Sequence, residues 1–231
     1  MKKIGMIGGL SWQSTVDYYR VANEESNKLL GGCDTAEILM YSVNLAEMLG
    51  YAGNNEKETL ARRLCEVAKT LEDAGAGLVV LCTNTMHMVA PEIEAALHVP
   101  FLHIADAAAA EIKRRGFTKV GLLGTPFTMS QPFYRERLKE LHGIDVIIPD
   151  ERHHAEIYRV ITDELTFGKL LDSSRAYFLS VIEELRAAGA QGVVLGCTEI
   201  PMLIKQKDTD LPVFDTATLH AAEAVRLAAM D

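Results

Sequence analysis

The stretch "AGAGLVVLCTN", Ala74–Asn84, decides the fold because it returns 114 residues later as "AGAQGVVLGCT", Ala188–Thr198. Each copy has a glycine where a helix would end, then a short apolar run, then a cluster of polar residues. Short apolar runs bounded by turn residues are typical of buried strands in a parallel sheet. Each copy therefore predicts one strand followed by a polar loop.

Two further repeats flank this one. The residues "IGMIGG" from Ile4 resemble "VGLLGT" from Val120, 116 residues on. The residues "VPFLHIADAAAAE" from Val99 resemble "LPVFDTATLHAAE" from Leu211, 112 residues on. Three offsets this similar indicate that the chain contains two related halves.

The alternation of short apolar runs with segments of helical period, such as residues 14–29 and 153–167, favours βα units on parallel sheets. We therefore expect an α/β fold with two pseudo-symmetric lobes, each a mostly parallel sheet flanked by helices, with the active site in the cleft between them. The repeats place the first lobe at residues 1–115 plus 211–231 and the second at residues 116–210.

Composition excludes several functional classes. The chain has 231 residues, of which 48% are hydrophobic, and a net charge of -9 without a Lys/Arg cluster, which argues against a nucleic-acid surface. No segment approaches the roughly 20 apolar residues of a membrane span, and the apolar run before Gly8 is too short for a signal peptide. The four cysteines form no CxxC pair. We expect a cytoplasmic protein without a metal or other cofactor, and with no membrane or nucleic-acid partner.

Polar residues follow the predicted strands, where open α/β sheets bind their ligands. The spacing of Gly5, Gly8 and Gly9 does not match the GxGxxG fingerprint of dinucleotide sites, so a tight turn into a helix capped by Ser11 or Ser14, whose N-terminus could hold an anion, is the better interpretation. The polar residues expected to converge at the strand ends are Ser14 with the rest of the loop 11–15, Thr83, Asn84, Thr85, Thr125, Cys197, Thr198 and Glu199.

The two strand ends differ in where they place cysteine. An ungapped alignment of the repeat sets Cys82 against Gly196 and Thr83 against Cys197, whereas pairing the two cysteines needs an insertion at the strand end. A one-residue slip would turn the side chain to the other face of the sheet. We therefore expect Cys82 to be a buried strand residue and Thr83 to be the equivalent of Cys197. A helix start after Cys197 would favour its thiolate.

The motifs "GGLSWQST", "CTNTMH", "LLGT" and "LGCTEIPML" resemble those of the aspartate/glutamate racemase family, cofactor-independent amino-acid racemases. The resemblance extends over the whole chain. It implies two pseudo-symmetric lobes, a homodimer, and two-base catalysis in which a cysteine of each lobe serves one face of Cα.

One motif departs from the family pattern. The usual Cys-Asn-Thr is matched here by Thr83-Asn84-Thr85, with threonine in place of cysteine. The resemblance implies that Cys197 removes the α-proton of L-aspartate or L-glutamate, while Thr83, or a water that it holds, serves the other face less well. Lys169 is the candidate for the distal carboxylate.

Two alternatives stay open from the sequence. Decarboxylases and cis–trans isomerases of the same superfamily also use cysteines in this cleft, and a single cysteine suits them. A non-catalytic amino-acid-binding protein could retain the two-lobed clamp.

Overall fold

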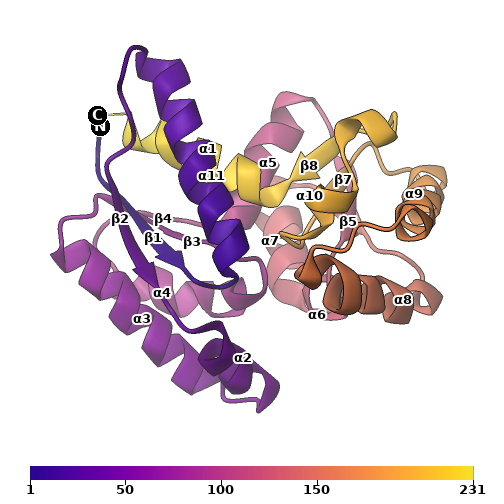
Figure 1. The fold of residues 1–231 in the computed structure, drawn as a ribbon, viewed down its shortest axis with the longest axis horizontal. Helices are drawn as coiled ribbons and strands as arrows, with labels where there is room; N and C mark the ends of the chain where they lie inside the picture. The colour runs from indigo at the N-terminus through magenta and orange to yellow at the C-terminus, as the bar shows by residue number, and fades with distance from the viewer. Residues whose placement is uncertain (231) are drawn as a thin grey trace. The chain divides into compact units, whose positions relative to one another are not determined.

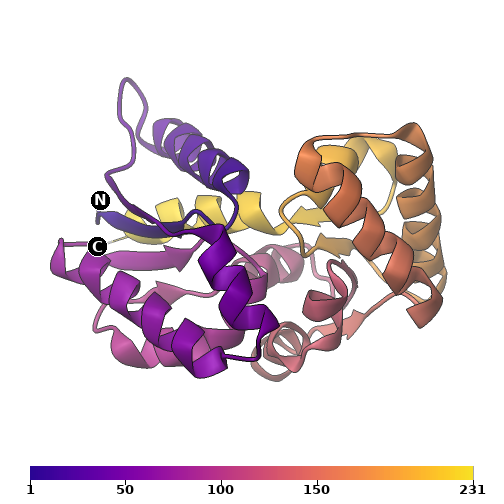
Figure 2. The same ribbon diagram turned by 60° about the horizontal axis from the view of Figure 1, so that its bottom comes forward.

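The computed structural model describes residues 1–230, which form two compact units (Figures 1 and 2). The first unit comprises Met1–Ile104 and the chain from Ala217 onward, and the second comprises Ala105–Thr216. The sequence placed these boundaries after residues 115 and 210.

The first unit contains a four-stranded parallel sheet in the order β2-β1-β3-β4. Its elements are β1 (Ile4–Gly8), α1 (Trp12–Leu30), β2 (Ile38–Ser42), α2 (Leu45–Gly53), α3 (Lys57–Asp73), β3 (Leu78–Leu81), the 3-10 helix η1 (Thr85–Val89), α4 (Ala90–Ala96), β4 (Phe101–Leu102) and α11 (Thr216–Ala228).

The second unit contains a parallel sheet in the order β6-β5-β7-β8. Its elements are α5 (Ile104–Arg114), β5 (Lys119–Leu123), α6 (Pro126–Ser130), α7 (Pro132–His142), β6 (Asp145–Ile147), η2 (Glu151–His153), α8 (His154–Arg159), η3 (Val160–Glu164), η4 (Leu165–Phe167), α9 (Asp172–Ala187), β7 (Val193–Leu195), α10 (Ile200–Leu203), η5 (Gln206–Asp208) and β8 (Val213–Asp215). Both sheets therefore have the same strand order, and the predicted α/β fold of two similar lobes is confirmed.

Each sheet packs a helix against one glycine of its first strand. A Cβ on Gly5 would lie 3.2 Å from Cβ of Leu71 on α3, and a Cβ on Gly121 would lie 3.3 Å from Cβ of Leu185 on α9. Ridges of the two helices can therefore approach the sheet closely at equivalent positions. The same side of the first sheet holds an apolar core, formed by α3 with Ile7, Val79 and Leu81.

The prediction of one regular helix over residues 153–167 is wrong. The segment passes from α8 through a π-helical turn, η3, into the 3-10 helix η4. The buried Glu164 lies at the junction, where its carboxylate accepts a hydrogen bond from the Ser174 hydroxyl and pairs with Arg159 at 2.9 Å. A side chain drawn inward for these partners interrupts the regular helical turn.

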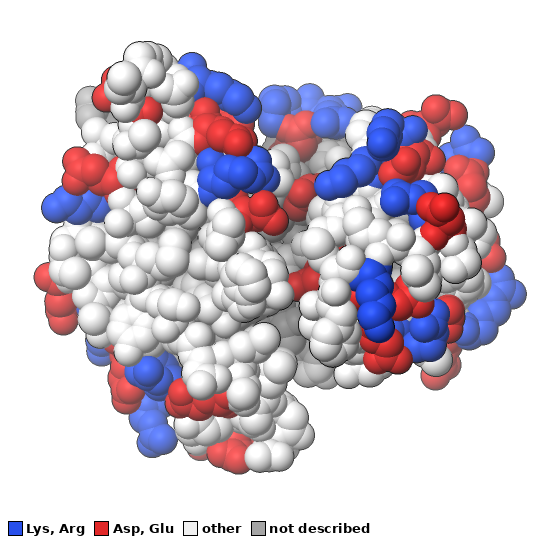
Figure 3. Space-filling model, in the orientation of Figure 1, with Lys and Arg blue, Asp and Glu red and all other residues white. Residues whose placement is uncertain are grey.

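The face of the molecule in Figure 3 shows Lys and Arg side chains beside Asp and Glu. Ion pairs on the surface include Arg20 with Glu24 at 3.0 Å. No helix within residues 1–230 is both long and apolar enough to cross a membrane.

Candidate active site

The hydrogen-bond registers of the two sheets settle which residues are equivalent at the strand ends. Gly5 of β1 is the partner of Val79, and Gly121 of β5 is the partner of Val193. Because Gly5 and Gly121 occupy the same place in the repeat, Val79 corresponds to Val193. Counting along the strands then sets Cys82 against Gly196 and Thr83 against Cys197.

Hydrogen bonds at both edges agree with this register. The Cys82 N–H donates to the Ile7 carbonyl at 3.0 Å, and the Gly196 N–H donates to the Leu123 carbonyl at 2.6 Å. Ile7 and Leu123 occupy equivalent positions in the first repeat. The ungapped alignment therefore describes the backbone as well as the sequence.

Cys82 lies in the core. It is fully buried, and burial raises the pKa of its thiol far above the ordinary range. The next residue, Thr83, is 7% exposed and stands beyond the end of β3. The prediction that Cys82 is buried is confirmed, although Cys82 is the first residue after β3 rather than part of the strand. The thiol at this position is not available as a base.

The backbone of Thr83 is fixed by His87, which is fully buried. Nδ1 of His87 donates to the Thr83 carbonyl at 2.7 Å, because a carbonyl can only accept. Nε2 of the same ring accepts the N–H of Ile104 at 3.1 Å. The imidazole is therefore neutral with its proton on Nδ1, and it joins the end of β3 to the start of α5.

Two more histidines lie beside this ring. His103 and His220 are buried with ring centroids 4.4 Å and 5.8 Å from His87. His220 donates from Nε2 to the Leu102 carbonyl at 2.8 Å and accepts the Tyr18 hydroxyl at Nδ1 at 2.8 Å. The hydrogen bonds of His87 and His220 give these two rings a structural role in the first unit. Within residues 1–230 no three His, Cys, Asp or Glu side chains gather as metal ligands.

Asn84 and Thr85 continue the β3 loop into η1. Asn84 is buried at the N-terminus of that 3-10 helix, where its carbonyl accepts the N–H of His87 at 3.1 Å. Thr85 is the first residue of η1 and is partly buried. The predicted trio Thr83-Asn84-Thr85 therefore forms one compact turn at the carboxyl end of β3.

The β7 end places Cys197 beside a carboxylate. Sγ of Cys197 donates to Oε2 of Glu199 at 3.0 Å, and the Thr198 hydroxyl donates to the same oxygen at 2.9 Å. Cys197 is 9% exposed, and Thr198 and Glu199 are partly buried. From the sequence, Glu199 is expected at this strand end, but only Cys197 and Thr198 are given a role in the site. The signal for Glu199 was its place in "CTE", two residues after the cysteine.

The expectation that the local setting favours a Cys197 thiolate is wrong. Burial, followed by the nearby negative charge of Glu199 and its hydrogen bond, raises the pKa of the Cys197 thiol well above its usual value. The N–H groups of Glu199 and Ile200 lower the pKa, but by less. Their effect is small because α10 begins only at Ile200 and has four residues, so its dipole is short.

Ser14 and Thr125 stabilise the turns after the first strand of each unit. Ser14 lies in the first turn of α1, where its N–H and hydroxyl both bond to Ser11, the N-cap. Thr125 caps α6 by accepting the Thr128 N–H at 3.3 Å. Both hydroxyls are engaged locally, and each lies at the carboxyl end of a central strand.

Lys169 lies in the second unit, in the exposed loop between η4 and α9. Its Nζ lies 5.7 Å from the centroid of the Phe167 ring. η4 packs against α10, the short helix that follows Cys197-Thr198-Glu199. Lys169 therefore follows, by two residues, an element that contacts α10.

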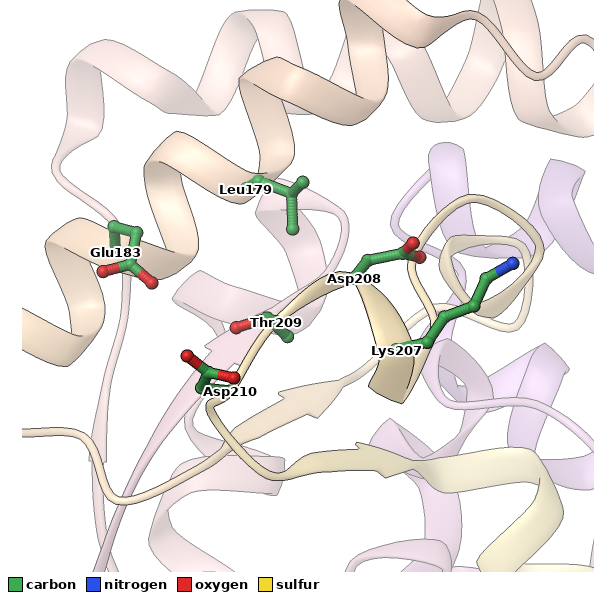
Figure 4. A pocket seen from close by; sticks show the side chains of 6 residues that line it. All are labelled: Leu179, Glu183, Lys207, Asp208, Thr209 and Asp210. Atoms are coloured by element: carbon green, nitrogen blue, oxygen red, sulfur yellow. The ribbon is translucent and has the colours of Figure 1, made fainter.

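A hollow elsewhere in the second unit contains none of the predicted residues (Figure 4). Its lining residues come from α9 and the η5 loop: Leu179, Glu183, Lys207, Asp208, Thr209 and Asp210. Three carboxylates against one ammonium group would repel an anionic ligand. The carboxyl ends of the strands are therefore the better candidate site.

Known proteins resemble this chain in sequence over most of its length. The sequence profile of the Asp/Glu/hydantoin racemase family matches residues 7–224. The chain belongs to this family. Its members form a racemase, and hence isomerase, class, and the family resemblance inferred from the motifs is confirmed.

Some solved structures are highly similar to this chain over its whole length. A Yersinia pestis protein provisionally assigned to the Asp/Glu racemases is 46% identical with a TM-score of 0.95, and each chain is covered completely. An aspartate racemase homologue from Pyrococcus horikoshii is 38% identical with a TM-score of 0.89, again with full coverage of both chains.

Among curated relatives, the broad specificity amino-acid racemase RacX of Bacillus subtilis is 23% identical over 96% of both chains. The chain described here spans about half the length of several curated glutamate racemases that it matches.

Proposed function

We propose that this racemase interconverts the enantiomers of aspartate or glutamate without pyridoxal phosphate or metal, and that Cys197 acts on the L-enantiomer. The supporting observation is the register of the two sheets, which gives equivalent backbone positions to Cys197 and Thr83. Inversion through a planar carbanion needs an acid and a base on opposite faces of Cα. The proposal requires both strand ends to reach the same substrate.

Because the pKa of the Cys197 thiol is raised, the thiol needs a nearby group to accept its proton, and we assign this role to Glu199. The thiol already donates to Oε2 of Glu199. Moving this proton from Sγ to Oε2 yields a thiolate beside a neutral acid, so the pair keeps a single negative charge and no second anion forms in a buried place. The thiolate then removes the Cα proton, which re-forms the thiol.

The remaining roles follow from donor chemistry. The carbanion spreads its charge onto the substrate carboxylate, which the Asn84 amide and the hydroxyls of Thr85 and Thr125 are suited to hold. Ser14 and Thr198 join them when their hydroxyls turn from Ser11 and Glu199 to the substrate. Thr83, or water bound to it, returns a proton to the other face, and the proton on Glu199 restores that donor through water. Lys169 pairs with the distal carboxylate.

Threonine is a poor acid and base, so we expect an asymmetric enzyme. The two enantiomers have equal free energy in water, so kcat/KM must be the same in both directions. The asymmetry must therefore show in kcat and in exchange: L-substrate should trade its Cα proton with solvent through Cys197 faster than it inverts.

The test is a panel of L- and D-amino acids in D₂O, with Cα exchange followed by NMR and inversion by polarimetry. We expect exchange of L-aspartate or L-glutamate to outpace inversion, and the D-enantiomer to turn over with a lower kcat. Equal kcat values from both enantiomers would overturn the asymmetry. Binding without exchange would favour an amino-acid-binding protein. Release of carbon dioxide would favour a decarboxylase.

We further propose a homodimer, as the family resemblance implies, and a cytoplasmic location. Sedimentation equilibrium measures the first directly: a mass of twice 25.4 kDa is expected, and a mass of 25.4 kDa would contradict it.

A further inference from the structure

The loop that carries Lys169 is unusual in exposing apolar side chains. Every residue of the segment 166–171, "TFGKLL", is exposed, and Phe167 is 72% exposed. Leu170 and Leu171 are each close to half exposed. A soluble protein gains nothing in stability from a phenyl ring left in water. The ring is therefore a candidate for a role in the site.

The base of this loop is firmly held. The N–H of Lys169 donates to the Glu164 carbonyl at 2.9 Å, and the buried Glu164 carboxylate binds Ser174 at the start of α9. Gly168 takes the left-handed conformation with φ of 70°, which turns the chain between Phe167 and Lys169. The hydrogen-bonded base and the tight turn fix the backbone of Phe167 and Lys169, from which the two side chains extend.

We propose that Phe167 is a positioning residue for Lys169: its ring face restricts the ammonium group that pairs with the distal carboxylate and so sets the preference for an acidic substrate. The proposal rests on the proposed racemase function. The Lys169 ammonium is 5.7 Å from the ring centroid, within the reach of a cation–π interaction. η4, which includes Phe167, packs on α10, directly after the residues that hold the Cys197 proton.

The physical benefit is entropic. A free lysine side chain has four rotatable bonds and loses much of that freedom when it pairs with a ligand. A ring that already restricts the ammonium reduces this loss, so a distal carboxylate binds more tightly. An uncharged side chain gains nothing from the arrangement.

The experiment compares Phe167→Leu, which removes the ring face, with Phe167→Tyr, which keeps it, and with Leu171→Ala as a matched change in the same exposed loop. KM and kcat are measured for aspartate and for its uncharged analogue asparagine, and aspartate binding is measured by calorimetry. Phe167→Leu should raise KM and Kd for aspartate about two- to fivefold with kcat unchanged. Phe167→Tyr and Leu171→Ala should both leave the KM and Kd for aspartate at the parent values. The KM for asparagine should be the same in all three variants as in the parent.

A double-mutant cycle separates positioning from simple contact with the substrate. Lys169→Met should raise KM for aspartate roughly ten- to a hundredfold, and adding Phe167→Leu to it should have no further effect. Additive effects, or an equal effect of Leu171→Ala, would overturn the proposal.

The outcomes also distinguish this proposal from the racemase proposal. If Cys197-dependent exchange is observed but Phe167→Leu leaves KM unchanged, only the role of Phe167 fails. If no amino acid exchanges its Cα proton, the racemase proposal fails and the calorimetric constants alone decide on Phe167. Absence of aspartate binding would overturn both.

Discussion

The ends of β3 and β7 share one backbone and differ in their side chains. Each strand pairs with a central partner in the same register, and each ends in a polar turn. In the first unit the thiol is one residue earlier, at Cys82, and lies in the core; in the second it is at Cys197, beside Glu199. A shift of one residue along a strand separates a packing residue from a candidate base.

The two ends also differ in what supports them. The β3 end is held by a neutral histidine that bonds to the Thr83 carbonyl, and its neighbours are two further buried histidines. The β7 end has a carboxylate that accepts the thiol proton. The first arrangement fixes a backbone, whereas the second can also move a proton. The difference predicts which end carries the chemistry.

The largest expected effect is loss of the β7 thiol. Cys197→Ser should lower the rate of Cα exchange of L-aspartate by roughly a hundred- to ten-thousandfold, because a hydroxyl is a much weaker base than a thiolate. Exchange in D₂O measures it. Cys82→Ala is the matched control at the other strand end. An enzyme with full exchange after Cys197→Ser would not use this thiol as its base.

Loss of the proton acceptor, Glu199, should have the second largest effect on the rate. Glu199→Gln keeps the size of the side chain but offers a neutral amide, so kcat should fall about a hundredfold. Removing the negative charge also removes one cause of the raised pKa of Cys197, so the pH at which the remaining activity rises should move downward. Glu151→Gln, on the exposed start of η2, is the control. An unchanged pH profile would remove Glu199 from the proton path.

A thiol at the ends of both β3 and β7 should raise kcat in the slow direction, from the D-enantiomer. Thr83→Cys places a thiol at the equivalent position, and kcat from D-aspartate should increase roughly tenfold or more. Inversion of the L-enantiomer should then approach its rate of exchange. Polarimetry from both enantiomers measures the change, with Thr83→Val as the control that lacks any acidic hydrogen. If the ratio of exchange to inversion stays the same, Thr83 does not serve the second face.

The smallest expected effect on activity belongs to Cys82→Ala. Because the thiol is in the core, the variant should exchange and invert substrate at the parent rates. It should lose about 1 kcal/mol of unfolding free energy, a Tm decrease of roughly 2–4 °C. Thermal unfolding followed by circular dichroism measures the loss. A large decrease in kcat without a change in Tm would mean that Cys82 takes part in the reaction.

The buried thiols also predict how stability depends on pH. Folding raises the pKa of Cys82, whereas the thiol of the unfolded chain ionises near its usual value of about 8.5. The contribution is therefore fully present below about pH 8.5 and is lost as pH rises further, at up to about 1.4 kcal/mol per pH unit for one thiol. Urea unfolding between pH 7 and 10 should show a shallower decline for Cys82→Ala than for the parent. Parallel declines would contradict this account.

Much of the fold and part of the candidate site follow from the sequence alone. The three repeats determined two lobes of equal topology, because a buried parallel strand needs an unbroken apolar run wherever it occurs. The ungapped alignment also gave the equivalence of Thr83 and Cys197, since strand periodicity allows no one-residue slip.

Other features depended on contacts between residues far apart in the chain. The π-helical turn at Val160–Glu164 follows from the contact of a buried carboxylate with Ser174 and Arg159, which helical periodicity does not report. The cation–π pair of Lys169 depends on a glycine turn. The protonation state of Cys197 was also beyond the sequence: a local helix start favours the thiolate, but burial and Glu199 oppose it more strongly. Only the tertiary structure sets how much water a thiol retains, and desolvation is the largest cause of its raised pKa.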